Sequence, residues 1–133
     1  MEQMSRSYAR EKAFEIIFAI NLSNMTDYEL DCLKDELKDH KKHMKYIRTV
    51  VCGVRDSQEE LDGIISQNLG DGWSINRLSK MSLAILRLAV YEIKHMEDIP
   101  VNVSINEAVE LSKKYGDDGE SQFINGILGK ISS

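Results

Sequence analysis

The stretch LAILRLAVYEI at residues 83–93 decides the fold. Only Arg87 and Glu92 interrupt its apolar side chains, and a helix that is apolar around most of its girth is normally buried on all sides. The stretch ends before Asp98-Ile99-Pro100, where the residue before proline is pushed out of helical geometry. We therefore expect a central buried helix that other helices surround.

Helical periodicity continues on both sides of this stretch. Ala13, Ile17 and Ile20 recur at the spacing of one buried helix face, and two capping-box patterns, at 26–29 and 104–107, predict helix starts. The predicted helices of the first half run from Ser5 or Ser7 to about Leu22, from Thr26 to about Asp39, and from about Lys42 to Leu69. Gly70-Asp71-Gly72 predicts a break, after which a short helical turn capped by Ser74 leads to the central stretch. The last two helices are predicted from Ser104 to a left-handed cap at Gly116 and from about Glu120 onward. The expected fold is all-α, with six or seven helices and one domain over 1–133, arranged as two bundles that share the central helix.

Composition limits the classes of protein that fit. The chain has 133 residues and a net charge of −5, which argues against a nonspecific nucleic-acid coat because phosphate binding needs a basic surface. Cys32 and Cys52 have no metal-binding spacing, so reduced thiols and a cytoplasmic location are expected. The polar first residues predict no signal peptide, and no stretch is apolar enough to predict a membrane span.

Motifs for catalysis are missing from the sequence. It contains no phosphate-binding GxxxxGK[ST] loop, no GxGxxG fingerprint and no HExxH zinc motif. His40 and His43 are three residues apart, but the lysines around them would repel a divalent cation. We therefore expect no catalytic residues, no metal and no cofactor.

Two basic stretches remain as candidate phosphate-binding sites. The first, from Lys38 to Arg48, has five basic residues against the single acid Asp39, although charge alone favours lysines exposed at a helix junction. In the second, Arg6 and Arg10 share one face of the first helix beside Tyr8, which offers a stacking surface. On composition alone, a frayed basic terminus is the alternative.

Several motifs in order give the chain a resemblance to the NusB family over nearly its whole length. The matching pieces are Ala9–Ala13, Leu61–Ile65 with Asn68-Leu69, Arg77–Lys80 after Trp73, Ala84–Glu92, Asp98–Val101, Ile105–Leu111 and Phe123–Leu128. The resemblance implies an all-α fold of two perpendicular three-helix bundles. It also implies a factor in antitermination of ribosomal RNA transcription, which binds boxA RNA together with the ribosomal protein NusE and acts on RNA polymerase.

The resemblance also implies which residues form the sites. Those implied for RNA binding are Arg6, Tyr8, Arg10, Asn68, Arg77, Gln122 and Phe123, and those implied for the NusE partner are Ser82 and Glu120. For Phe123, a place in the core is an equal alternative because it shares a stripe with Ile127. Asn125 and Gly126 are interpreted as packing and capping residues.

The chain departs from the family pattern at several of these positions. Relatives often carry an arginine or lysine where this chain has Ser7, Tyr8 and Gln122. An acidic residue is common where it has Ser82. We therefore expect modest affinity for free RNA, with NusE supplying much of the binding. A protein-interaction adaptor without direct RNA readout is the alternative, and a homodimer is left open. An enzyme, by analogy with methyltransferases that carry a NusB-like domain, is disfavoured because the chain has no cofactor motif.

Overall fold

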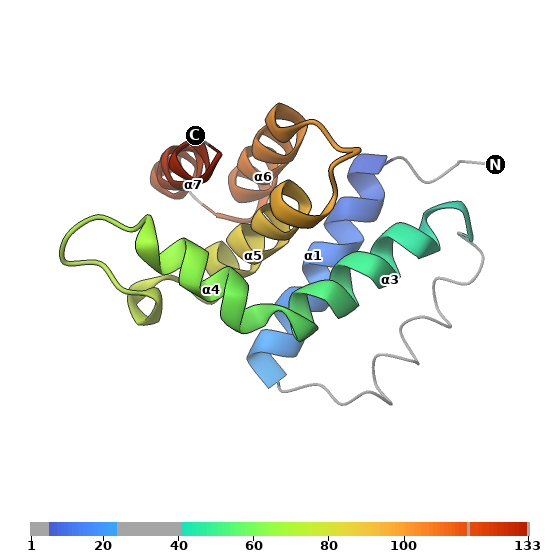
Figure 1. Ribbon diagram of the computed structural model, residues 1–133, viewed down its shortest axis with the longest axis horizontal. Coiled ribbons are helices and arrows are strands. Elements are labelled where there is room, and N and C mark those ends of the chain that lie inside the picture. The colour runs from blue at the N-terminus through green and yellow to red at the C-terminus, as the bar shows by residue number, and fades with distance from the viewer. Residues whose placement is uncertain (1–5, 24–40, 117, 133) are drawn as a thin grey trace.

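The computed structural model describes residues 6–23, 41–116 and 118–132, with only the backbone at 21–23, 41, 42 and 118. The described residues form six α-helices and a 3-10 helix, with no strand among them, which confirms the all-α prediction (Figure 1). In order these are α1 (Arg6–Ser23), α3 (Lys41–Asp56), α4 (Gln58–Gln67), η2 (Ile75–Arg77), α5 (Lys80–His95), α6 (Val101–Tyr115) and α7 (Asp118–Ile131). The helix predicted over 26–39 lies outside the described residues.

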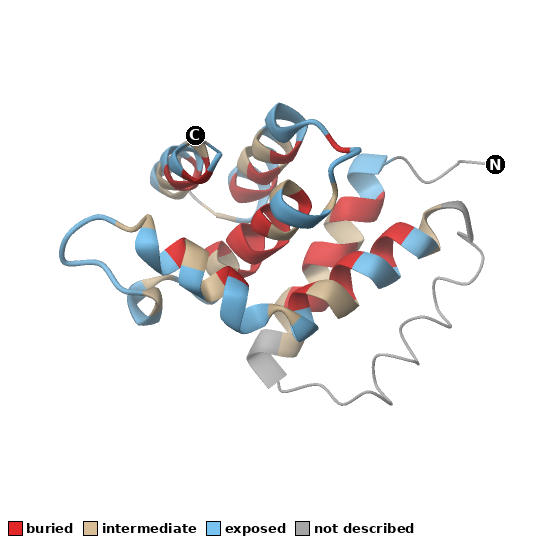
Figure 2. Ribbon diagram, in the orientation of Figure 1, coloured by how far each residue is buried: buried red, intermediate tan, exposed pale blue. Residues whose placement is uncertain are grey.

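Helix α5 lies at the centre of the fold, as its sequence predicts. It contacts α1 and α3 on one side and α4, α6 and α7 on the others. Its residues Ala84 to Val90 are all buried, and Figure 2 shows the buried faces of the surrounding helices turned toward it. The α4 helix is fastened to it by Arg87, which donates two hydrogen bonds, of 2.7 and 2.8 Å, to the two carboxylate oxygens of Asp62.

The long helix predicted from Lys42 to Leu69 is interrupted at Ser57. The residue has φ −107° and ψ 15°, which separates α3 from α4. Hydrogen bonds from Ser57 N to Gly53 O and from Leu61 N to Ser57 O nevertheless continue across the junction. Glu59 and Glu60 lie in the first turn of α4, where negative charge favours a helix start. The prediction of one continuous helix was therefore wrong, because the backbone angles at Ser57 divide it into α3 and α4.

The start of α6 also differs from the prediction. The helix begins at Val101 after Pro100, a full turn before the capping box expected at Ser104. Pro100 is the N-cap residue with a φ of −59°, and the helix loses no hydrogen bond through its missing N–H because the first N–H groups of a helix have no partner within it. Ser104 is buried instead, and its hydroxyl donates to Glu92 Oε1 at 2.7 Å. The serine serves a tertiary contact and not a cap.

Two glycines shape the connections around α5. The predicted break at residues 70–72 is confirmed, and Gly72 has a φ of +83° in a turn closed by a hydrogen bond from Trp73 N to Gly70 O. Gly116 does not adopt the predicted left-handed conformation, since its φ is −131°. A Cβ at Gly116 would lie 2.5 Å from Met81 Cε and 2.7 Å from Glu120 Oε2, so the ends of these two flexible side chains would have to move to make room for it.

Candidate nucleic-acid interface

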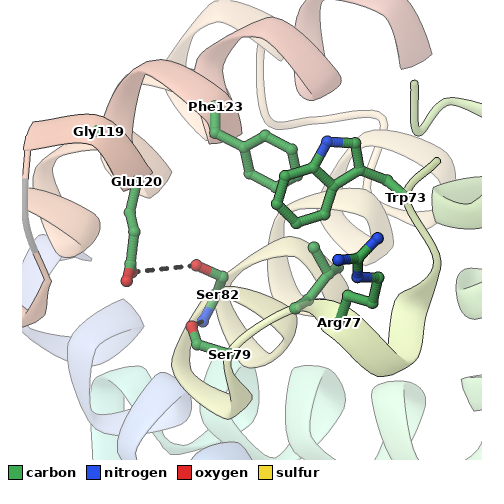
Figure 3. Close-up of a pocket in the computed structure, with 8 residues that line it drawn as sticks. Trp73, Arg77, Ser79, Ser82, Gly119, Glu120 and Phe123 are labelled. Carbon is green, nitrogen blue, oxygen red and sulfur yellow. Dashed lines mark hydrogen bonds between the residues drawn. The ribbon is translucent and has the colours of Figure 1, made fainter. Parts of the chain in front are cut away.

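A pocket of about 480 Å³ opens where η2 and the start of α5 meet the start of α7 (Figure 3). Its lining residues come from three separate parts of the chain: Trp73, Arg77, Leu78, Ser79, Ser82, Gly119, Glu120 and Phe123. Four residues that the family resemblance implies for RNA or partner binding, Arg77, Ser82, Glu120 and Phe123, therefore meet in one place. We call this cavity the Trp73 pocket.

One wall of the Trp73 pocket is aromatic and cationic. The Trp73 and Phe123 ring centroids are 5.5 Å apart with the planes tilted by 43°, and the Arg77 guanidinium lies 5.7 Å from the Trp73 centroid. Arg77 Nη1 donates to Gly72 O at 2.7 Å, which fixes the guanidinium beside the ring. Trp73 is 51% exposed. A partly exposed ring held beside a fixed cation suits stacking of a base and contact with its phosphate.

The opposite wall is polar. Ser79 caps α5 by accepting a hydrogen bond from Ser82 N at 3.0 Å, and the Ser82 hydroxyl donates to Glu120 Oε2 at 3.1 Å (Figure 3). Ser82 is only 3% exposed, so it orients Glu120 and offers little surface of its own to a partner. The half-buried Glu120 brings a carboxylate to the rim of the Trp73 pocket.

Arg10 is buried in the core and does not line the Trp73 pocket. It is 2% exposed, and its Nε donates to Glu92 Oε2 at 2.7 Å, while Nη1 lies 3.5 Å from Glu107 Oε1. The Tyr46 hydroxyl and the Ser104 hydroxyl also donate to the Glu92 carboxylate. Burial leaves Arg10 no face for a phosphate, so the prediction that it contacts RNA is not supported by its placement.

Electrostatics explain why the charges of this buried network are kept. Burial opposes the charged form of Arg10, but the hydrogen bond to Glu92 and the nearby carboxylates outweigh it and raise the pKa of Arg10. Burial, together with the Glu92 carboxylate, raises the pKa of Tyr46 well above its ordinary value. The tyrosine therefore stays protonated and the arginine stays charged.

Other predicted RNA residues at the N-terminus are exposed. Arg6 is exposed at the first residue of α1, and the Tyr8 ring is 42% exposed with Lys12 Nζ 5.2 Å from its centroid. The first turn of α1 is attached to α6, because the Ser7 hydroxyl donates to Glu107 Oε1 at 2.6 Å. These residues keep their predicted role as a hypothesis.

No single positive edge joins Arg6 to the Trp73 pocket in the described residues. Helix α6 packs against α7 and is hydrogen-bonded to α1 through Glu107, and its lysines are paired with acids. Lys114 Nζ lies 2.6 Å from Glu11, and Lys113 Nζ lies 3.6 Å from Glu110. Within the described residues, Arg6 at the start of α1 and Arg77 at the Trp73 pocket therefore belong to two separate regions.

The remaining predicted positions are scattered. Asn68 is half-buried at the end of α4, where its Nδ2 donates to Ile64 O at 2.8 Å. Gln122 is exposed on the side of α7 that faces α6. Of the basic cluster at 38–48, Lys45 and Arg48 are exposed on α3, whereas Lys38 lies outside the described residues. None of the four described side chains lines the Trp73 pocket.

Trp73 is the residue that sequence reasoning missed. Its signal was present, because the chain's one tryptophan directly follows the turn at 70–72, where a large apolar ring has little core to enter. Half of its surface is in fact exposed.

Neither a metal cluster nor a membrane-spanning helix is found in the part of the chain that the structure describes. In the described ranges, no three His, Cys, Asp or Glu side chains are gathered as a metal ion would need. None of the helices described is both long and apolar enough to cross a bilayer.

Comparisons with known proteins agree on one family. The NusB family model matches residues 7–133. The chain is 45% identical to the transcription antitermination protein NusB of Listeria monocytogenes serotype 4a, over 97% of each chain. It is 42% identical to that of Bacillus subtilis strain 168, over 98% of this chain and 96% of the relative.

Solved structures give the same result. NusB of T. maritima matches with a TM-score of 0.84 and 32% identity, covering 98% of this chain and 92% of that one. NusB in a crystal structure with NusE and double-stranded RNA matches with a TM-score of 0.82 and 28% identity, covering 96% and 95%. This chain belongs to the NusB family.

Proposed function

We propose that this protein is a transcription antitermination factor that binds boxA-type RNA together with the ribosomal protein NusE, as part of an RNA polymerase antitermination complex. It acts by binding and not by catalysis, and it works in the cytoplasm. The relatives' names and the NusB structure that contains NusE and RNA support this proposal.

The Trp73 pocket is the observation on which the RNA-binding part depends. Trp73, Phe123 and Arg77 offer two ring faces and a cation at an accessible cavity. Stacking on aromatic side chains is how proteins usually hold unpaired RNA bases, and it is worth about 1–3 kcal/mol per base. The half-exposed Phe123 is therefore interpreted as a stacking residue that also packs against the core.

Local geometry also explains why affinity for free RNA should be modest. Arg10 is buried, and Glu120 places a carboxylate at the pocket rim, where it repels phosphate. The protein as a whole carries a net charge of −5. A basic partner such as a ribosomal protein would relieve this repulsion by lying beside the RNA.

Fluorescence anisotropy with boxA-type RNA and a scrambled RNA, with and without NusE, tests this function. Trp73→Ala and Phe123→Ala should each weaken boxA binding by about 5- to 100-fold, as expected for one lost stacking contact. Val101→Ala serves as the control, because it shortens an exposed apolar side chain outside the pocket. If both pocket variants bind RNA like the unaltered protein, the Trp73 pocket is not the RNA site. If the unaltered protein with NusE also binds boxA-type and scrambled RNA equally, the adaptor alternative is correct.

A further inference from the structure

A second groove lies between α6 and α7, and carboxamides dominate its lining. It has a volume of about 500 Å³ and is lined by Asn106, Val109, Lys113, Ser121, Gln122 and Asn125. No carboxylate is among these residues, although acids outnumber bases in the chain as a whole. We call this feature the amide groove.

The three carboxamides of the amide groove have unused hydrogen-bonding capacity. Asn106, Gln122 and Asn125 are exposed, and no side chain or backbone group in the described residues hydrogen-bonds their amides. Asn125 lies in the middle of α7, so it neither packs nor caps, contrary to the interpretation from sequence. Each carboxamide carries a donor and an acceptor side by side, the pattern that a base edge also presents.

Helix α7 is the ridge that separates the amide groove from the Trp73 pocket. Gln122 and Phe123 are consecutive, yet Gln122 lines the groove and Phe123 lines the pocket. Exposed glycines lower this ridge at 119 and 126, and a Cβ at Gly126 would meet no atom within 4 Å. Glycine inside a helix costs about 1 kcal/mol relative to alanine, and nothing within the described residues requires it at Gly126. The backbone of an RNA strand could therefore pass close to the α7 helix at these glycines.

We propose that the amide groove reads the edge of one unpaired base, with adenine preferred, in the RNA strand that crosses α7 from the Trp73 pocket. Asparagine and glutamine pair with adenine through two hydrogen bonds, and unpaired RNA bases expose such edges. A peptide would instead need apolar side-chain pockets, and Val109 is the one apolar residue in the lining. This inference rests on the proposed function and extends it from stacking to base discrimination.

Base substitution in the RNA tests the amide groove directly. The full-length chain and its Asn106→Ala/Asn125→Ala variant are titrated, with NusE present, against boxA-type RNAs in which each base is replaced in turn. The unaltered protein should discriminate at one position by about 5- to 100-fold, and the double variant should lose that discrimination without a change in salt slope. Gln122→Ala removes one of the three carboxamides and should lose part of the discrimination.

Asn102→Ala is the matched control, since it removes an exposed carboxamide of α6 that lies outside the groove. It should discriminate like the unaltered protein. Discrimination retained in the double variant overturns the inference, and so does a loss of NusE binding with RNA binding unchanged. If Trp73→Ala weakens RNA binding while the amide variants do not, only the amide groove proposal fails. If neither pocket nor groove variants weaken it, the proposed function fails as well.

Discussion

Arg10 and Arg77 share a side chain and a predicted role, but the structure gives them opposite surroundings. Arg10 is buried against Glu92 on the central helix, where Tyr46 and Ser104 also meet the carboxylate. Arg77 lies exposed beside Trp73 and donates to a turn carbonyl, that of Gly72. The difference comes from what each arginine faces: a buried carboxylate on α5 for Arg10, and solvent at η2 for Arg77. A buried carboxylate on α5 requires a counter-charge, while η2 faces solvent, so one arginine stabilises the fold and the other is available to a ligand.

Alanine substitution at the two arginines gives the largest expected contrast. Arg10→Ala leaves Glu92 buried without its counter-charge, and we expect a loss of about 3–5 kcal/mol in the free energy of unfolding. Arg77→Ala removes an exposed side chain and should cost about 0.5 kcal/mol. Urea denaturation followed by circular dichroism measures both. Equal losses in the two variants would mean that Arg10 is not buried in solution.

Glycine-to-alanine changes sharpen the same contrast between core and ligand surface. A Cβ at Gly53 in α3 would lie 2.2 Å from Tyr91 Cζ on α5, so Gly53→Ala should destabilise the protein by about 1–3 kcal/mol through overpacking. Gly126→Ala meets no atom and should stabilise the protein by up to about 1 kcal/mol, because alanine favours helix. Thermal melts of both variants measure the signs. A stabilised Gly53→Ala would show that the Tyr91 ring moves aside to make room for the Cβ.

Much of the fold could be predicted because period and composition are local signals. The central helix, the start of α1 and the turn at 70–72 all follow from residues within a few positions of one another. The interruption at Ser57 and the start of α6 before Ser104 were missed. In the second case the serine hydroxyl had a buried carboxylate from another helix as its partner, which no local pattern reports.

The candidate site was predicted in part for a related reason. Phe123 and Arg77 were named from the family resemblance, and the fold brings them within one pocket. Arg10 was named for its place on the first helical turn, but the sequence contains no sign that Glu92 faces it across the core. Exposure of a charged residue depends on the opposite helix, and 82 positions separate these two partners.

Two substitutions at the exposed Arg77 test whether its guanidinium binds RNA, because neither should unfold the protein. Arg77→Lys keeps the charge but loses the planar group beside Trp73, so we expect about a threefold loss in affinity for boxA-type RNA and an unchanged salt slope. Arg77→Ala should lose about tenfold and reduce the slope by about one unit, because a phosphate contact is lost. Anisotropy titrations at several salt concentrations measure both. Identical behaviour of the two variants would remove the stacking part of this role.

Glu11 offers the smallest effect, and it is sensitive to pH. It joins α1 to α6 at the surface, with Lys114 Nζ at 2.6 Å and the Tyr115 hydroxyl at 2.5 Å, and these two hydrogen bonds hold its pKa below the ordinary 4.5. A depressed carboxyl pKa stabilises the fold above pH 4.5, and this contribution is lost as the pH falls through the folded-state value. Glu11→Gln should therefore be less stable than the unaltered protein by under about 1 kcal/mol at pH 7, with the gap closing below pH 4.5.

The matched control for this titration is Glu110→Gln, whose partner Lys113 lies on the same helix at 3.6 Å with both side chains exposed. Removing that pair breaks no contact between helices, so its stability should follow the unaltered protein at every pH. Urea midpoints at pH 7, 5, 4 and 3 give both curves. A gap for Glu11→Gln that stays constant down to pH 3 would assign its effect to packing. The charge at Glu11 would then contribute nothing to stability, and among the described residues the ion pairs of Arg10 with Glu92 and Glu107 would be the ones that join α1 to α5 and α6.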